Sequence, residues 1–325
     1  MPELPEVETV VRDLRPMLAG RTVTGVRQSK SKLRRPWKPA WSADATGARI
    51  EGVRRRGKWI LIDLGPKDPS PTPPPGGEGL KTKGSALAPP SFLGKGAGGL
   101  GSSPLLRVHL GMTGQFTVVP AGAPEPDHLH LVFALDNKKE LRLRDPRRFG
   151  SAEYFANRNA LETEMNAELG PEPFDLDPDY FRGAVRGTRR NLKALLLDQK
   201  VVAGVGNIYA DEACFRAGLH PGRPGKSLSP DECDRLRDSI EAVLTRAIES
   251  RGSTIRDYVG GSGLRGGFQN ELAVYGRADE PCPTCETAIA VARHAGRASH
   301  YCPRCQPVKS KAGRSKVVKS KNRAP

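Results

Sequence analysis

The first apolar residues of the chain recur at the spacing of an α-helix. These residues would share one helical face: Val7, Val10, Val11, Leu14 and Leu18. Pro5 stands before most of them and suits a first helical turn, because its fixed φ is helical and its missing N–H needs no partner there. The pattern predicts a helix that begins within the first few residues.

Strand-like patterns then follow through the first half of the chain. Apolar and polar residues alternate, or apolar residues form short runs, in the segments 22–28, 48–53, 59–64, 105–119, 127–135 and 140–144. A turn is expected near Asp136 and Asn137, between the last two segments. The first half is therefore predicted to be rich in β-structure.

Helical periodicity dominates the second half. Residues 175–199 are predicted to be helical, and a glycine-rich break precedes a further helix at 208–217. Asn207 stands at this break as a candidate N-cap, and the free N–H groups of a helix start suit phosphate. A plain helical hairpin explains the same pattern. Ser229 opens the next helix with a capping box, and Gly252 closes it. Its apolar face is formed by Leu236, Ile240, Val243, Leu244 and Ile248.

Three segments lack an apolar period. Residues 65–104 contain nine Pro and ten Gly, a composition that cannot bury enough surface to fold, so a disordered excursion between two strands is expected. Such a long loop adds only a modest closure entropy. Residues 258–267 are glycine-rich and fit either a mobile functional loop or a plain surface linker. Residues 306–325 are basic and are predicted to be a disordered tail.

The charge of the chain points to a polyanionic partner. The net charge is +16 and the pI about 9.8. The tail contributes +7 through five Lys and two Arg, which leaves +9 in the other residues. Charge alone does not distinguish nucleic acid from an acidic membrane surface. No apolar run approaches the ~18–20 residues of a membrane span, and no signal segment opens the chain, so a soluble cytoplasmic protein is expected.

The N-terminus carries candidate chemistry. Removal of Met1 before the small residue Pro2 would leave a secondary amine, which in its neutral form can attack an aldehyde-like carbon and form a Schiff base. A terminal amine titrates near ~7.7–8.0, so part of it is neutral at physiological pH. Glu3 and Glu6 could move protons beside it. The alternative is an ordinary acidic start of an amphipathic helix.

Four of the six cysteines have the spacing of a metal site. Cys282, Cys285, Cys302 and Cys305 form the pattern C-x₂-C-x₁₆-C-x₂-C, which falls within the spacing of structural zinc sites. Four thiolates fill a tetrahedral shell and leave no open position for catalysis. Two disulfides are the alternative. The segment between the pairs should form a hairpin. The other two cysteines fall in predicted helices, as packing thiols.

Residues 145–150 (DPRRFG) form a predicted turn with two arginines and an aromatic side chain. An arginine can pair with an unpaired base while apolar side chains fill the gap left by an extruded nucleotide. Arg147, Phe149 and the more distant Met112 are candidates for this role. Core packing for Met112 and Phe149, with a surface position for the arginines, is the alternative.

The sequence resembles the bacterial formamidopyrimidine-DNA glycosylases, which excise oxidised purines such as 8-oxoguanine. The resemblance begins with MPELPEVETV at the N-terminus and returns, in the family's order, at 55–60 (RRGKWI), 109–114 (HLGMTG), 145–150, 204–212 (GVGNIYADE), 268–277 (FQNELAVYGR) and the four-cysteine segment. It covers most of residues 1–305. The insertion at 65–104 and the basic tail depart from the family pattern.

The resemblance implies catalytic roles for five residues. Pro2 is the nucleophile, Glu3 handles protons and Glu6 positions the nucleotide. Lys58 contacts phosphate and assists elimination, and Arg297 is placed as proton donor in the final elimination.

DNA contacts are implied as well. Met112, Arg147 and Phe149 match the set that fills the void in the duplex. The implied DNA-binding residues also include His128, Arg189, Lys193 and Asn207. By the same resemblance, the loop at 258–267 closes over the extruded base.

The implied fold is a multidomain α+β protein. Its expected units are an N-terminal β-sandwich with flanking helices (1–155), a helix–two-turn–helix domain (156–270) and a zinc-finger β-hairpin (271–305), followed by the tail. One structural Zn²⁺ is expected, and no redox cofactor.

The implied function is a bifunctional DNA glycosylase/AP lyase, acting as a monomer on duplex DNA with oxidised bases or abasic sites in the bacterial cytoplasm and nucleoid. Two alternatives remain. An endonuclease VIII-like enzyme for oxidised pyrimidines would share Pro2, Glu3 and the finger. A non-catalytic zinc-finger DNA-binding protein would have lost the N-terminal machinery, yet Pro2, Glu3, Glu6 and Lys58 are all present.

Overall fold

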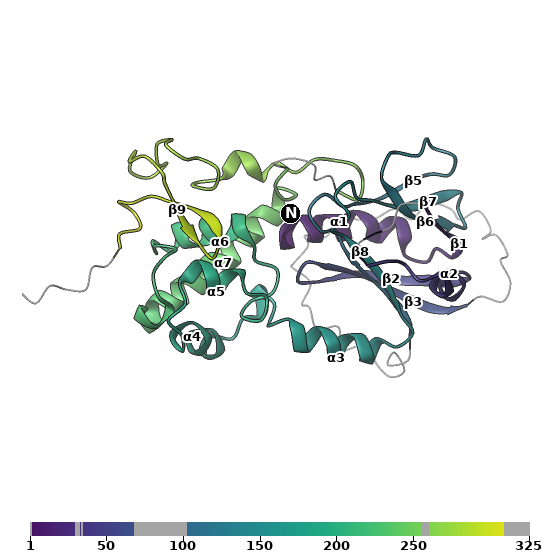
Figure 1. The fold of residues 1–325 in the computed structure, drawn as a ribbon, viewed down its shortest axis with the longest axis horizontal. Helices are drawn as coiled ribbons and strands as arrows, with labels where there is room; N and C mark the ends of the chain where they lie inside the picture. The colour runs from purple at the N-terminus through teal and green to yellow at the C-terminus, as the bar shows by residue number, and fades with distance from the viewer. Residues whose placement is uncertain (1, 30–32, 34, 68–102, 255–259, 309–325) are drawn as a thin grey trace, which may run out of the picture.

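The computed structural model describes residues 2–29, 33, 35–67, 103–254 and 260–308. The chain forms two parts that lie side by side, with its N-terminal end between them (Figure 1). The first part contains two four-stranded sheets, and the second contains most of the helices and a C-terminal hairpin. These features confirm the predicted α+β class, with a β-rich N-terminal part, a helical part and a cysteine-bearing hairpin.

The predicted first helix is α1 (Leu4–Leu18), and its apolar face is completely buried. The Glu6 carboxylate accepts a hydrogen bond from the backbone nitrogen of Glu3 at 2.8 Å, as in a capping box. The helix packs against both β2 (Ala48–Arg56) in the first part and α7 (Pro230–Glu249) in the second. α1 therefore holds the N-terminal end of the chain at the junction of the two parts.

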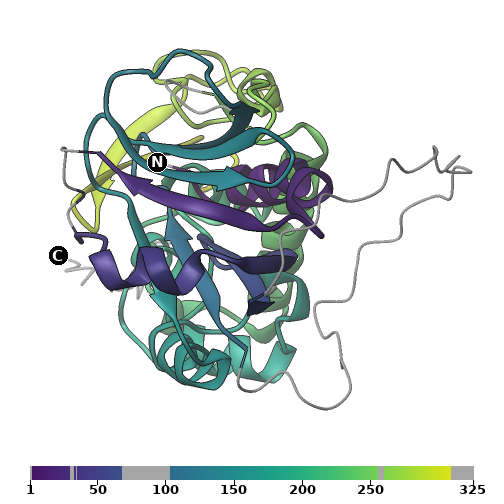
Figure 2. The same ribbon diagram turned by 90° about the vertical axis from the view of Figure 1, so that its right-hand side faces the viewer.

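The first part is a sandwich of two antiparallel sheets, with strand orders β1-β6-β7-β5 and β2-β3-β4-β8. Figure 2 views the molecule from this end, where the sheets lie one above the other. Their remaining strands are β1 (Val23–Gln28), β3 (Trp59–Lys67), β4 (Leu105–His109), β5 (Gln115–Pro120), β6 (Leu129–Leu135), β7 (Lys139–Arg144) and β8 (Ser151–Phe155). Side chains from both sheets, including Ile62, Val108, Phe116 and Phe133, form one core with α1.

The segment 105–119, expected as one run of strand, forms two strands in different sheets. Between β4 and β5 the chain turns at residues 110–114, where Gly111 has a φ of +61°. A Cβ on Gly111 would lie 2.5 Å from the backbone nitrogen of Gly150. Only glycine permits this approach, which brings the turn that carries Met112 against the turn at 145–150.

Three further elements were not predicted from the sequence. These are α2 (Pro39–Ala45), β8 and α3 (Arg158–Glu168). α3 buries only Leu161 and Met165, so its apolar period is weak, and its start depends on a local cap in which Asn157 Oδ1 accepts from the backbone nitrogen of Asn159 at 2.8 Å. Figure 1 shows α3 on the path from the sheets to the helical part.

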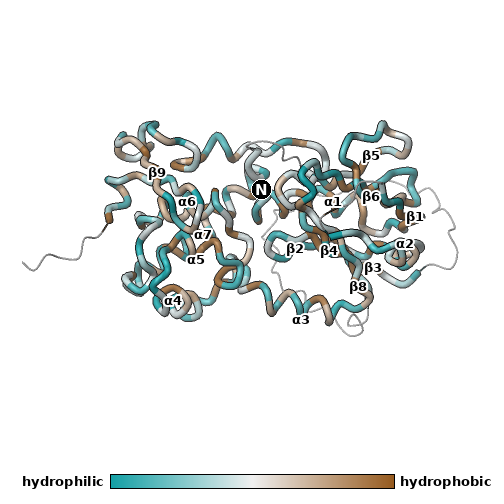
Figure 3. The backbone as a smooth tube through the Cα atoms, in the orientation of Figure 1, coloured by the Kyte–Doolittle hydropathy of each residue, from teal (hydrophilic) through white to brown (hydrophobic). Residues whose placement is uncertain are grey.

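The helical part consists of α4 (Pro178–Arg186), α5 (Leu192–Leu197), α6 (Asn207–Arg216), α7 and short 3₁₀ turns at Pro173–Asp175, Gly225–Ser227 and Phe268–Glu271. Hydrophobic residues recur along these helices (Figure 3), and their buried faces form a second core that also includes Leu4. The capping box of α7 is confirmed, with Ser229 and Glu232 exchanging hydrogen bonds of 2.9 and 3.2 Å. The prediction that Asn207 caps α6 is wrong: Gly206 is the N-cap, and Asn207 is the first helical residue.

The C-terminal hairpin consists of β9 (Ala290–His294) and β10 (Arg297–Tyr301) and packs against α6. Glu212 of α6 accepts backbone N–H groups from Ala273, Val274 and Tyr275 at 2.8–3.0 Å, which fixes the segment that leads into the hairpin. The hairpin is therefore held on the helical part by its packing against α6 and by the bonds of Glu212 to the segment before its first cysteine pair.

Several predictions fall on residues outside the described ranges. They concern the insertion between 68 and 102, residues 258–259 of the glycine-rich loop and the tail from 309. Among the described residues, no helix has both the length and the apolar character needed to cross a membrane.

Candidate active site

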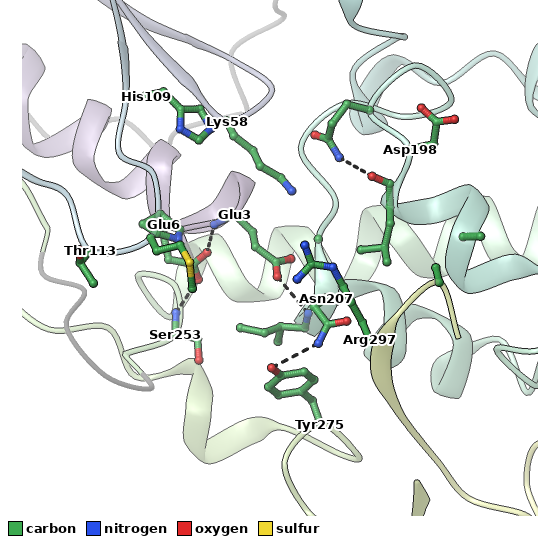
Figure 4. A pocket seen from close by; sticks show the side chains of 18 of the residues that line it. Glu3, Glu6, Lys58, His109, Thr113, Asp198, Asn207, Ser253, Tyr275 and Arg297 are labelled. Atoms are coloured by element: carbon green, nitrogen blue, oxygen red, sulfur yellow. Dashed lines mark hydrogen bonds between the residues drawn. The ribbon is translucent and has the colours of Figure 1, made fainter. Parts of the chain in front are cut away.

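A cleft of about 810 Å³ opens where the two parts meet, and Pro2 lies in its wall. Eight of the predicted functional residues line this cleft: Pro2, Glu3, Glu6, Lys58, Met112, Arg147, Asn207 and Arg297. They come from α1, the sheets, α6 and the hairpin, and Figure 4 shows several of them facing the same space. The fold thus collects residues that are almost three hundred positions apart in the sequence.

Glu3 is held by the start of α6. Its Oε1 accepts the backbone N–H of Ile208 at 3.0 Å, and its Oε2 lies 3.5 Å from the nitrogen of Tyr209. A Cβ on Gly206 would lie 2.3 Å from the Glu3 carboxyl carbon, so any side chain at this N-cap would displace the carboxylate. The positive end of a helix suits a carboxylate. The N–H groups that the sequence suggested for phosphate are thus used to fix Glu3 beside Pro2.

Glu6 is almost completely buried, and among the described residues three groups donate hydrogen bonds to its carboxylate. They are the nitrogen of Glu3, the hydroxyl of Tyr209 at 2.5 Å and the nitrogen of Ser253 at 2.7 Å. Burial, and next the negative charge of Glu3, raise the pKa of Glu6 above its ordinary value, and the three hydrogen bonds oppose this rise. Glu6 therefore links α1, α6 and the segment that follows α7.

Lys58 enters the cleft from the turn between β2 and β3. Glu172 fixes this turn by accepting from Arg55 at 2.7 Å and from the nitrogen of Gly57 at 2.6 Å. Burial lowers the pKa of Lys58, and nearby Glu3 partly offsets this effect. A lysine with a lowered pKa holds its proton less tightly, which suits a group that exchanges protons during a reaction.

His109 also lines the cleft, although the sequence did not single it out as a site residue. Burial, and next the positive charge of Lys58, lower the pKa of His109 to about 4. Its Nδ1 accepts the N–H of Gly111 at 2.9 Å, so the neutral ring carries its proton on Nε2. The only sequence signal was its place in the HLGMTG motif, directly before the Met112 turn.

The turns at 110–114 and 145–150 together present polar and apolar side chains beside the cleft. Asp145 anchors the 145–150 turn by accepting from Thr113 at 2.6 Å and from the nitrogen of Gly150 at 2.7 Å. The Arg147 guanidinium lies 5.0 Å from the centre of the Phe149 ring. Met112 and Phe149 are 38% and 45% exposed, which excludes the core-packing alternative for both. Exposed apolar side chains beside an arginine suit contact with a ligand.

On the opposite side, α6 and the hairpin contribute Asn207 and Arg297. The Asn207 amide nitrogen lies 3.4 Å from the hydroxyl of Tyr275, and its buried Oδ1 has no hydrogen-bond partner among the described residues. Arg297 is exposed at the start of β10 and reaches the cleft (Figure 4).

The four cysteines of the hairpin segment form a compact cluster. Their sulfur atoms all lie within 4.8 Å of one another, with Sγ–Sγ distances of 3.4 Å for Cys285–Cys302 and 3.9 Å for Cys282–Cys305. Zn–S bonds of ~2.3 Å in a tetrahedron place sulfur atoms about 3.8 Å apart. All four are free thiols, not disulfides. The cluster fits one tetrahedral zinc ion.

Comparison with known proteins identifies the family. The profile described as formamidopyrimidine-DNA glycosylase N-terminal domain matches residues 1–152, that of the family's H2TH domain matches 169–259, and that of a zinc finger found in FPG and IleRS matches 279–308. The formamidopyrimidine-DNA glycosylase of Geobacillus kaustophilus is 41% identical over 310 residues, which cover 94% of this chain and 100% of that protein. The chain belongs to the formamidopyrimidine-DNA glycosylase family.

Solved structures of the family agree. A Lactococcus lactis FPG variant in complex with Fapy-dG-containing DNA has a TM-score of 0.78 and 31% identity, and the match covers 94% of this chain and 100% of that one. The L. lactis Fpg in complex with DNA containing an abasic site has a TM-score of 0.77 at the same identity and coverage. As a member of this family, the chain is a DNA glycosylase of base excision repair with one structural zinc ion in its finger.

One contact predicted from the family resemblance disagrees with the structure. The expectation that Lys193 touches DNA phosphate is wrong, because its side chain is fully buried and forms an ion pair with Asp211 at 2.6 Å. His128, Arg189 and Phe149 are exposed but do not line the cleft. Any contact they make with DNA lies outside its walls.

Proposed function

We propose that this chain excises oxidised purines, 8-oxoguanine and formamidopyrimidines, from duplex DNA and then cleaves the strand through a Schiff base on Pro2. The observation that carries the proposal is the position of Pro2 in the wall of the cleft, with Glu3 fixed beside it by α6 and with Lys58 on another wall. A proline whose nitrogen becomes a free amine on removal of Met1, in a cleft that Glu3 and Glu6 also line, has little use in a protein that only binds DNA.

The first step is a displacement at the anomeric carbon of the extruded nucleotide. Once Met1 has been removed, the free nitrogen of Pro2 forms a bond to C1′ as the glycosidic bond breaks, and the damaged base leaves with a proton. Glu3 moves protons during base loss and sugar ring opening, which yields an iminium ion between Pro2 and the open-chain sugar. Glu6 positions the nucleotide through the rigid set of bonds that fixes its carboxylate.

Strand cleavage follows from the acidity of the iminium ion. Loss of a proton from C2′ expels the 3′-phosphate, and a second elimination expels the 5′-phosphate. Hydrolysis then releases the unsaturated aldehyde and regenerates the amine. Lys58 contacts phosphate and assists these eliminations, and Arg297 supplies a proton in the last one. The lowered pKa of Lys58 supports this role.

Extrusion of a base leaves a void in the duplex. Met112, Arg147 and Phe149 fill it, with Arg147 pairing to the orphaned base. Their exposure and the close approach of the two turns support this assignment. Asn207 and Arg297 hold phosphates flanking the lesion, and the exposed His128 and Arg189 add contacts along the backbone. The chain acts on DNA as a monomer in the bacterial cytoplasm.

The test compares substrates directly. Single-turnover excision is measured on duplexes with 8-oxoguanine opposite cytosine and with thymine glycol opposite adenine, and the Glu3→Gln variant is the matched inactive control. Faster excision of 8-oxoguanine is expected. Preference for thymine glycol would support the endonuclease VIII-like alternative, and no excision of either base, despite tight binding, would support the non-catalytic one.

A further inference from the structure

Lys193 is buried in the helical part and has two partners. Its Nζ donates to Asp211 Oδ1 at 2.6 Å and to the backbone oxygen of Asn207 at 2.7 Å. The side chains of Lys193 and Asp211 are both 0% exposed. A lysine of α5 is thus bound to the first turn of α6, at the residue whose amide faces the cleft.

The second oxygen of Asp211 binds the zinc-finger hairpin. Oδ2 accepts the backbone N–H of His300 at 3.0 Å and lies 3.3 Å from its Nδ1. His300 belongs to β10, the strand that begins at Arg297. A single carboxylate therefore connects α5, α6 and the hairpin.

These contacts form a closed circuit of side chains and one backbone carbonyl. The His300 ring lies 5.0 Å from that of Tyr275, and the Tyr275 hydroxyl is 3.4 Å from the amide nitrogen of Asn207. Figure 4 shows Asn207 and Tyr275 joined in this way, with Arg297 beside them. The backbone carbonyl of Asn207 accepts from Lys193 and so completes the circuit.

Stability alone does not account for this arrangement. The desolvation of two buried charges offsets much of their attraction, and apolar replacements of a complete buried pair are often neutral or stabilising. An ion pair with fixed hydrogen-bond directions does, however, define one position of the hairpin on α6. Because Arg297 begins the strand that this pair holds, a displaced hairpin moves its guanidinium relative to Asn207.

We propose that Lys193 and Asp211 are positioning residues that fix the zinc-finger hairpin on α6. They thereby set the position of Arg297 relative to Asn207, so that both side chains can contact the bound DNA together. The inference rests on the proposed function only for the roles of Arg297 and Asn207. It assigns to a buried pair an effect on DNA binding that neither side chain exerts by contact.

The first experiment needs no DNA. Hydrogen exchange of the hairpin is compared between the wild-type zinc-loaded protein and the double variant Lys193→Met/Asp211→Asn, which removes both charges and retains similar volumes. The His300 amide and its neighbours in β10 should exchange faster in the variant, while zinc content stays at one per chain. Unchanged protection would overturn the proposal, whatever reaction the protein catalyses.

The second experiment measures coupling to Arg297. Affinity for a duplex with a tetrahydrofuran abasic analogue is measured for the wild type, the double variant, Arg297→Ala and the combination of all three changes. The double variant should bind more weakly by roughly tenfold, because a displaced guanidinium loses a charge-assisted hydrogen bond to DNA. With Arg297 already removed, the same double change should cause less than about a twofold further loss.

Two other outcomes contradict the proposal. Equal losses in both backgrounds, with a smaller salt slope, would mean that Lys193 contacts phosphate after all. If the affinity of the variants for the duplex falls only in proportion to their melting temperatures, the Lys193–Asp211 pair has a purely structural role. Arg142→Met is the matched control, because the described partners of this buried cation of β7 all lie in the first part, namely Glu140 and the backbone at 123–124. It should lower stability without altering the Arg297 effect.

Discussion

Glu3 Oε1 lies 3.0 Å from the backbone nitrogen of Ile208, so the carboxylate next to the N-terminal proline is fixed by a helix from the other part of the molecule. Gly206 makes this approach possible. The first residues of the chain and the GVGNIYADE motif therefore form one unit, in which α6 orients the acid beside Pro2. Catalysis is expected to depend on the junction of the two parts and on neither part alone.

His109 gives the junction a defined pH response. Its pKa of about 4 lies below the ordinary 6.5, so the unfolded chain binds a proton on this ring in a pH range where the folded chain does not. The stabilising contribution is present above pH 6.5 and is lost as pH falls toward 4. Between pH 7.5 and 4.5, the wild type should lose roughly 2–3 kcal/mol more unfolding free energy than His109→Gln. Urea titrations at both pH values measure this difference, and parallel losses would show that His109 titrates normally.

The finger should unfold without the sandwich when its metal is lost. Cys302→Ala should contain no zinc and bind lesion DNA poorly, because a thiolate site is coupled to local folding. All three tryptophans (Trp37, Trp41 and Trp59) lie in the first part, so their fluorescence reports its unfolding alone and should remain near that of the wild type. Cys233→Ala, which removes a buried thiol outside the cluster, should retain one zinc per chain. Zinc-free protein that still binds and excises would refute the structural role of the metal.

Many elements followed from the sequence because their signals are local. The helical spacing of α1, the strand patterns and the capping box at Ser229 each depend on residues within one element. Lys193 was misassigned because its DNA contact was carried over from the family resemblance. Its actual partner, Asp211, is recognisable only once α5 and α6 are packed together. Asn207 was taken for an N-cap because the sequence does not reveal that Gly206 must leave room for Glu3.

His109 was missed for a related reason. Its lowered pKa arises from burial and from Lys58, a residue brought near by the pairing of β3 with β4. The two residues belong to separate motifs, 55–60 and 109–114, and only the pairing of the strands shows that they line the same cleft.

The insertion offers a test of what the sandwich requires. β3 and β4 are neighbouring antiparallel strands, with Asp63 paired to Leu105, so a short turn can join them. Replacing residues 68–102 by a two-residue turn should leave tryptophan-detected unfolding and 8-oxoguanine excision near wild-type values. A marked fall in melting temperature or in excision would mean that the segment packs on the protein or takes part in the reaction.

Arg147 should control recognition of the base opposite the lesion. Arg147→Ala removes a side chain able to form two hydrogen bonds to a base, so discrimination between opposing bases should fall by roughly 1–3 kcal/mol. Arg148→Ala is the matched control, since this neighbouring exposed arginine does not line the cleft and should weaken all duplexes alike. Binding is titrated with each of the four opposing bases at several salt concentrations. A uniform shift for Arg147→Ala would make its turn only a phosphate contact.

The most direct test of the covalent chemistry is the mass of the protein after borohydride reduction in the presence of lesion DNA. The iminium ion would be reduced to a stable amine, and the adduct should map to the N-terminal peptide that begins at Pro2, with much less adduct in Pro2→Gly. If the adduct instead maps to Lys58 or another lysine, and Pro2→Gly traps and cleaves like the wild type, Pro2 is not the nucleophile.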